Sequence, residues 1–187
     1  MNSNLAVYQP PLQRRTFQRR DLIPYTEHRL WRIEAGWVRS MTWDEDGLIT
    51  TLGFWRSGDV ISSMLVQVHP CHFECLTKVE VSLLPPNFSY PEAVLIDHIQ
   101  QVQTLLRINH QRRIESRLLM FLHWLAQQFG HAVAQGYLIE LRLTHQEIAD
   151  VIGSTRVSIT RLLRQLEQQG TIGWSRQRCI VLNMEHH

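Results

Sequence analysis

Apolar residues between Leu143 and Gln168 recur at intervals of three and four, which predicts two short helices separated by a turn. Thr144 and Glu147 form a capping-box pattern at the start of the first helix, Gly153 ends it, and Ser154 is expected to cap the second. The predicted buried positions are Ile148, Ala149 and Ile152 on the first helix and Ile159, Leu162, Leu163 and Leu166 on the second. Together these features predict a helix-turn-helix.

The outward face of the second predicted helix carries Thr155, Arg156, Ser158 and Arg161. These side chains are hydrogen-bond donors of the kind that contact base edges and phosphates in a DNA major groove. A purely structural helix pair has the same apolar spacing. Its solvated face normally includes acidic residues, however, and here none follows Arg156 until Glu167. The pattern therefore favours DNA recognition.

Short runs rich in Trp, Val, Ile and Leu occupy residues 29–85 and alternate with polar positions, as in Leu30 to Ala35. Turns are expected at 44–47 and 57–59. The runs predict an antiparallel β-barrel or jelly roll. Residues 1–11 are predicted to be a mobile arm. The basic stretch with Arg14, Arg15, Arg19 and Arg20 is predicted to be a solvated loop or short helix, the alternative being contact with DNA or an acidic partner.

A helix is predicted from about Pro91, with Leu95, Ile99, Val102 and Leu106 at the spacing of a coiled-coil seam. Only about two heptads are present, so the seam either joins two subunits, which we favour, or packs on its own barrel. A polar stretch at 109–113 then marks a domain boundary. The predicted domains are 1–88, a β-barrel with its arm; 89–112, a dimerisation helix and hinge; and 113–187, a winged helix-turn-helix.

The third predicted domain begins with a helix at 114–129 that carries Leu118, Leu122 and Leu125 on one side. A short strand is expected at 138–143, and residues 171–182 predict a two-stranded wing. Arg176 and Arg178 at its tip are candidates for phosphate contacts, whereas Cys179 is expected to pack in the interior. The fold class is thus α+β. Residues 107–187 hold ten Lys and Arg against six Asp and Glu, so the basic excess lies with the helix-turn-helix.

Composition narrows the classes of function. The three cysteines do not suggest a disulfide-bonded secreted domain, the start of the chain lacks an apolar signal core, and no run reaches the roughly 20 apolar residues of a membrane span. A cytoplasmic protein without membrane contact is expected. No nucleophile–base pair, paired carboxylates or phosphate-binding glycine loop is present, so we predict that the protein is not an enzyme.

A cluster of His69, Cys71, His72 and Cys75 has a loose metal-ligand spacing and is the most reactive group in the sequence. Strand alternation would turn Cys75 inward, however, where it acts as a small hydrophobic side chain. We therefore predict no metal site and no cofactor, with a metal, haem or thiol switch at this cluster as the minor alternative.

The order of barrel, long helix and winged helix-turn-helix resembles the Crp/Fnr superfamily of bacterial transcription regulators. The resemblance covers nearly the whole chain. It is strongest in LTHQEIADVIGSTRVSITRLLRQLEQQGTIG, which looks most like the cyanobacterial nitrogen-regulator (NtcA) branch, and weaker in LWRIEAGWVR and FWRSGDVI. The region after Gly58 and Asp59 departs from the family: it is too short for a phosphate-holding helix and has no Arg, so we expect no cyclic-nucleotide binding. The N-terminal region has no cysteine cluster, so we do not expect an iron–sulfur sensor.

The resemblance implies that Arg156 reads a guanine in each half-site and that Arg161 contacts a base or phosphate. It places Thr144, His145 and Gln146 on the DNA backbone, together with Ser158 and either Ser154 or Thr155. Val157 stands where many relatives have Glu, and an apolar side chain there contacts a thymine methyl rather than cytosine N4. The predicted function is that of a homodimeric transcription regulator that binds palindromic double-stranded DNA, with RNA polymerase or another regulator as further partners. The alternative is an effector-free or redox- or metal-responsive co-regulator that acts through protein contacts.

Overall fold

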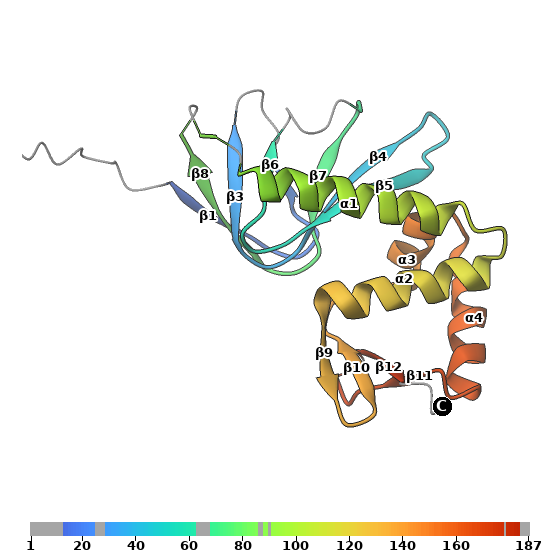
Figure 1. Cartoon of the computed structure of the whole chain (residues 1–187). Helices are drawn as coiled ribbons and strands as arrows, with labels where there is room; N and C mark the ends of the chain where they lie inside the picture. Colours follow the sequence, from blue (N-terminus) through green and yellow to red (C-terminus); the bar gives the residue numbers. More distant parts are fainter. Residues whose placement is uncertain are drawn as a thin grey trace, which may run out of the picture.

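The computed structural model of the chain describes residues 13–24, 29–62, 68–85, 88–89, 91–177 and 179–183. An N-terminal pair of β-sheets is followed by two helices that run in opposite directions, and then by a second helix pair and a small sheet (Figure 1). Within the described residues, no helix is long and apolar enough to cross a membrane.

The N-terminal unit consists of two four-stranded antiparallel sheets with the strand orders β1-β8-β3-β6 and β2-β7-β4-β5. They pack face to face around apolar side chains that include Trp31, Ile33, Trp55 and Phe73. This arrangement confirms the predicted jelly roll, and the two sheets do not close into one barrel. The strands are Arg14–Phe17 (β1), Leu22–Ile23 (β2), Leu30–Ala35 (β3), Val38–Trp43 (β4), Ile49–Trp55 (β5), Val60–Ser62 (β6), His72–Cys75 (β7) and Val79–Leu84 (β8).

The N-terminal region differs from the prediction at β1. The segment Arg14–Phe17 is a strand, so the expected loop or short helix was wrong for Arg14 and Arg15, whereas Arg19 and Arg20 lie in a turn. The backbone of β1 pairs with β8, and the Arg15 guanidinium lies 5.5 Å from the centre of the Trp31 ring. The predicted mobile arm lies outside the described residues. The predicted strand that includes Val60 is observed over three residues, which form β6. Its residues 63–67 lie outside the described residues.

The predicted long helix is confirmed as α1, Glu92–Asn109. One side of α1 is buried through Leu105 and Ile108, and Gln101 on that side exchanges two hydrogen bonds with the backbone of Phe54 in β5. Three of the four predicted seam residues are exposed, with Ile99 at 54%, Val102 at 42% and Leu106 at 68%, while Leu95 is half-buried. An isolated chain thus presents an apolar stripe to solvent.

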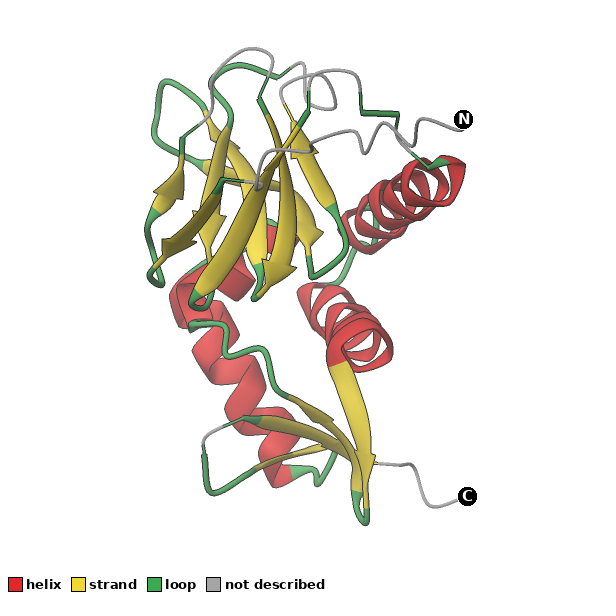
Figure 2. Ribbon diagram, turned by 90° about the vertical axis from the view of Figure 1, so that its left-hand side faces the viewer, coloured by secondary structure: helices red, strands yellow, loops and turns green. Residues whose placement is uncertain are grey.

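The C-terminal unit packs around α2, Ile114–Phe129, as predicted. It contains α3, His145–Ile152, and α4, Arg156–Gln168, with the strands Gly130–Val133 (β9), Gly136–Ile139 (β10), Ile172–Trp174 (β11) and Ile180–Asn183 (β12). These strands form one sheet in the order β11-β12-β10-β9, which lies below α2 and beside the lower end of α4 (Figures 1 and 2). The β11–β12 hairpin confirms the wing. The strand expected at 138–143 was misplaced: it is β10, and it pairs with the unpredicted β9.

Candidate nucleic-acid interface

The first helix of the helix-turn-helix, α3, begins with the predicted capping box. The Thr144 side chain accepts a hydrogen bond from the Glu147 backbone, and the Glu147 carboxylate accepts one from the Thr144 backbone at 2.5 Å. Gly153 ends the helix with a left-handed backbone (φ 62°), a conformation that glycine adopts without steric cost. The predicted apolar face of α3 is buried, and the predicted start and end of the helix are confirmed.

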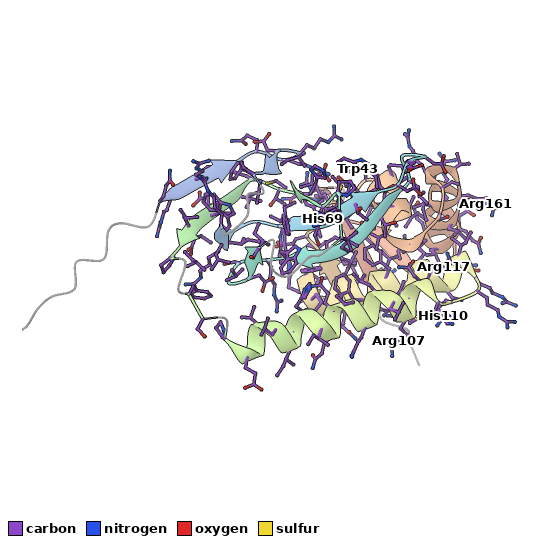
Figure 3. The ribbon with its side chains drawn as sticks, turned by 90° about the horizontal axis from the view of Figure 1, so that it is seen from above. Trp43, His69, Arg107, His110, Arg117 and Arg161 are labelled. Carbon is purple, nitrogen blue, oxygen red and sulfur yellow. The ribbon has the colours of Figure 1, made fainter. Side chains whose placement is uncertain are left out.

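The carbonyl groups at the C-terminal end of α3 are bound by two residues from outside the motif. Arg117 on α2 donates to the carbonyl oxygens of Ile152 at 3.1 Å and Gly153 at 3.3 Å. Asn109, the last residue of α1, donates to that of Val151 at 3.0 Å. Figure 3 shows Arg117 beside the turn between α1 and α2. A cation at this position also complements the negative end of the helix dipole.

Replacement of Arg117 by methionine is expected to destabilise the chain by about 1–3 kcal/mol, because it leaves carbonyl groups at the helix end without donors. Urea unfolding measures this change. Arg112→Met is the control, since Arg112 is exposed in the preceding turn. Equal unfolding midpoints for the two variants would contradict the structural role of Arg117.

The second helix, α4, is capped by Thr155, whose side chain accepts a hydrogen bond from the Ser158 backbone at 3.2 Å. The prediction that Ser154 is the cap was wrong by one residue. Ser154 lies half-buried, and its hydroxyl has no hydrogen-bond partner in the described structure. The predicted buried positions of α4, from Ile159 to Leu166, are confirmed. A hydrogen bond of 2.7 Å between His145 and Thr160 joins the start of α3 to α4.

The exposed face of α4 is basic. Arg156 and Val157 lie in its first turn, and Val157 is 79% exposed. Arg161 follows on the same helix (Figure 3). Within the described residues, neither Arg156, Arg161 nor Arg164 takes part in an ion pair. An open hollow along the helix is lined by Arg156, Val157, Thr160, Arg161, Arg164, Gln165 and Gln168. This surface can receive an anion such as a phosphate group.

The other predicted contact residues fall around α4. Gln146 is exposed and donates to Asp150, while Thr144 and Thr155 already accept hydrogen bonds as helix caps. Arg176 is exposed in the turn of the wing. Arg178, the other predicted wing residue, lies outside the described residues.

Sequence reasoning missed Arg164 as a member of this basic face. It follows Arg161 by three residues and Arg156 by eight, so the helical period could have identified it. Burial lowers the pKa of the His145 imidazole, and the positive charges of Arg156 and Arg164 lower it further. The positive charge of the surface therefore comes from the arginines.

The cysteines of the predicted reactive cluster lie in the core of the jelly roll. Cys71 and Cys75 are buried beside Phe73, whereas the His72 ring stacks on Trp43 at a centroid distance of 4.1 Å. Strand alternation explains this separation, since neighbouring residues of β7 face opposite sides of the sheet. Among the described residues, no group of three or more His, Cys, Asp or Glu side chains is arranged to hold a metal ion.

Burial raises the pKa of the Cys71 thiol to about 11 and that of Cys75 to about 12. Both are therefore protonated at pH 8, and only the thiolate reacts with a disulfide reagent. We expect a chromogenic disulfide reagent to modify them at least tenfold more slowly in the folded protein than in guanidinium chloride. Fast modification of either thiol in the folded protein would support the thiol-switch alternative.

The fold and this surface define a class: a winged helix-turn-helix joined to an N-terminal jelly roll, with a basic second helix exposed for contact with DNA. Residues 116–186 match the family model of the Crp-like helix-turn-helix domain. The chain is 39% identical over 166 residues to the regulatory protein CysR of Synechococcus elongatus, covering 87% of this chain and 81% of that protein. It is 30% identical over 193 residues to the global nitrogen regulator of the same organism, covering 92% and 87%.

A CRP-family transcriptional regulator from Thermus thermophilus has a similar structure, with a TM-score of 0.75 and 26% identity over 91% of this chain and 92% of that one. The chain belongs to the Crp/Fnr family of transcriptional regulators. The family resemblance seen in the sequence is thereby confirmed. The relatives are DNA-binding regulators rather than enzymes.

Proposed function

We propose that the protein acts as a homodimer that binds a palindromic DNA site through two copies of α4. The observation that carries this proposal is the exposed first turn of α4, where Arg156 and Val157 are free to reach base edges. The N-terminal residues of a recognition helix are the ones that contact bases in the major groove. Arg156 would read a guanine through O6 and N7, and Val157 would contact a thymine methyl.

The exposed stripe of α1 supports the dimer. Ile99, Val102 and Leu106 recur at intervals of three and four on a helix whose other side already packs on the jelly roll. A second copy of α1 would bury this stripe, as in a short coiled coil. Two-fold symmetry would then place the two recognition helices on one face of the DNA, one helical turn or about 34 Å apart. The symmetry of the dimer thus accounts for a palindromic site.

We further propose that DNA binding needs no cyclic nucleotide or other cofactor. In its described residues, the space between the two sheets is filled by large side chains, among them Trp31, Trp55 and Phe73. A hollow of about 360 Å³ lies instead between the β5–β6 turn, α1 and α2, and its lining includes the polar side chains of Asp97, Gln101 and Gln128. The proposed regulator therefore works through its abundance or through a protein partner.

The test is a fluorescence-anisotropy titration of the purified, ligand-free protein on DNA duplexes with two symmetric half-sites one helical turn apart. We expect binding that is at least about 1,000-fold tighter than to a scrambled duplex and that weakens steeply with salt, because basic side chains displace counterions from phosphates. Equal weak binding to both duplexes would contradict the proposal and favour a co-regulator that acts through protein contacts.

A further inference from the structure

The jelly roll and the helix-turn-helix are in direct contact through charged side chains on α3. Arg39 on β4 binds Glu74 on β7 at 2.6 Å and Asp150 on α3 at 3.3 Å. A second pair joins Arg19, which follows β1, to Glu147 on α3 at 3.3 Å. Arg19 also donates to the carbonyl oxygen of Arg142 at 3.0 Å, just before α3. We call these five side chains, Arg19, Arg39, Glu74, Glu147 and Asp150, the barrel–α3 contact.

Most of the barrel–α3 contact is shielded from water. The side chains of Arg39, Asp150 and Glu147 are 5%, 7% and 8% exposed, and that of Glu74 is 15% exposed. Buried charges need a partner in a fixed geometry, since an unpaired one carries a large desolvation cost. A small rotation or shift of α3 that admits no water would leave Asp150 buried without its arginine. The contact therefore favours one orientation of α3 on the jelly roll over neighbouring ones.

Both carboxylates lie on the same side of α3, three residues apart, and each binds an arginine from a different part of the jelly roll. Two ion pairs at different places along α3 fix the rotation of the helix as well as its distance from the jelly roll. Asp150 is also bound by Gln146 at 2.7 Å, and Glu147 belongs to the capping box, so their side chains are already oriented within α3. Because α3 packs on α4, the orientation that the jelly roll gives to α3 also determines the orientation of α4.

We infer that Arg39 and Arg19 are positioning residues for DNA recognition: they hold the helix-turn-helix on its own jelly roll in one orientation, in which α4 is exposed, without a bound effector. This inference rests on the proposed DNA binding and names the residues that set the geometry of the dimer. The α1–α2 turn is the covalent connection between the two units (Figure 1). Phe54 on β5 also packs on Phe121 and Trp124 of α2, and the barrel–α3 contact adds ion pairs to this apolar contact. Together these contacts restrict a hinge motion that the turn alone would permit.

The test uses the double variant Arg19→Met/Asp150→Asn of the full chain. The Asp150→Asn change keeps the size of the side chain and an oxygen for Gln146, and Arg39 keeps Glu74 as its partner. Glu147 loses Arg19 but keeps the hydrogen bond from the Thr144 backbone. Arg32→Met/Asp46→Asn is the matched control, since both residues are exposed on the jelly roll and neither forms an ion pair within the described residues. Anisotropy is measured on three duplexes: half-sites one turn apart, half-sites one base pair further apart, and a single half-site.

We expect the preference of the double variant for the first duplex over the second to fall at least about fivefold, with affinity for the single half-site unchanged within about twofold. A variant that merely loses folded protein would bind all three duplexes less well by the same factor. An unchanged preference would overturn the inference.

Calorimetry tests the contact without DNA. The double variant is expected to unfold at a lower temperature than the wild-type protein and the control, since α3 loses ion pairs to the jelly roll while the apolar contacts of Phe54 with α2 remain. Equal unfolding temperatures for the double variant and the control would overturn the inference. If no protein binds any duplex, the proposed function fails, and calorimetry alone still decides whether Arg39 and Arg19 couple the units.

Discussion

Alanine in place of Arg156 is expected to weaken binding to the symmetric duplex by about 2–6 kcal/mol, or roughly 30-fold or more. A bidentate arginine–guanine contact contributes about 1–3 kcal/mol of discrimination, and a dimer makes two of them. The exposed position of Arg156 in the first turn of α4 leaves its guanidinium free for this contact. Anisotropy titrations at constant salt measure the loss, and unfolding experiments check that the variant remains folded.

Arg164→Ala separates base reading from general attraction to DNA. Arg164 lies further along α4, where a phosphate is the expected partner, so its removal should weaken binding to symmetric and scrambled duplexes alike and lower the salt dependence. Arg156→Ala should instead affect mainly the symmetric duplex. If both variants lose affinity for both duplexes equally, α4 does not read sequence through Arg156.

Glutamate in place of Ile99 is expected to convert the dimer into monomers and to reduce affinity for the symmetric duplex at least about 100-fold. The charge would lie at the centre of the apolar stripe, facing its symmetry mate, where two carboxylates cannot be solvated. In a dimer, binding of one recognition helix to its half-site raises the effective concentration of the other helix at the second half-site. A monomer loses this gain. Light scattering after gel filtration measures the mass of the species in solution.

Gln100→Glu introduces the same charge at the adjacent exposed position of α1, about 100° around the helix from Ile99. It should leave the dimer and the DNA affinity unchanged. A dimeric Ile99→Glu variant would show that the stripe is not the subunit interface, and the proposed spacing of the recognition helices would then be wrong.

The helix-turn-helix could be predicted almost residue by residue because local interactions determine it. The capping box links positions 144 and 147, and Gly153 ends α3 through its own backbone conformation. The error at Ser154 has a local cause too: two adjacent hydroxyl residues can both cap a helix, and only the path of the turn selects Thr155. The strand β9 was missed because Gly130–Val133 is too short to show alternation.

Contacts between the two units could not be predicted from the sequence. Arg39 and Asp150 are 111 residues apart, and Arg19 and Glu147 are 128 apart, so no periodic pattern connects them. Arg39 lies in a strand at a position where alternation predicts an outward-facing side chain, which is normally solvated. Only the packing of α3 on the outside of that sheet makes Arg39 a buried residue. The contacts of Arg117 could not be predicted for the same reason, since its partners lie 35 and 36 residues further along the chain.

The exposed isopropyl group of Val157 has a consequence for chemically modified DNA. A thymine and a 5-methylcytosine carry the same methyl group at the same place in the major groove. If Val157 contacts that methyl group, as proposed, cytosine methylation would restore part of the affinity lost when the thymine is replaced by cytosine. Binding of this regulator to its sites would then depend on the methylation state of the chromosome as well as on its base sequence.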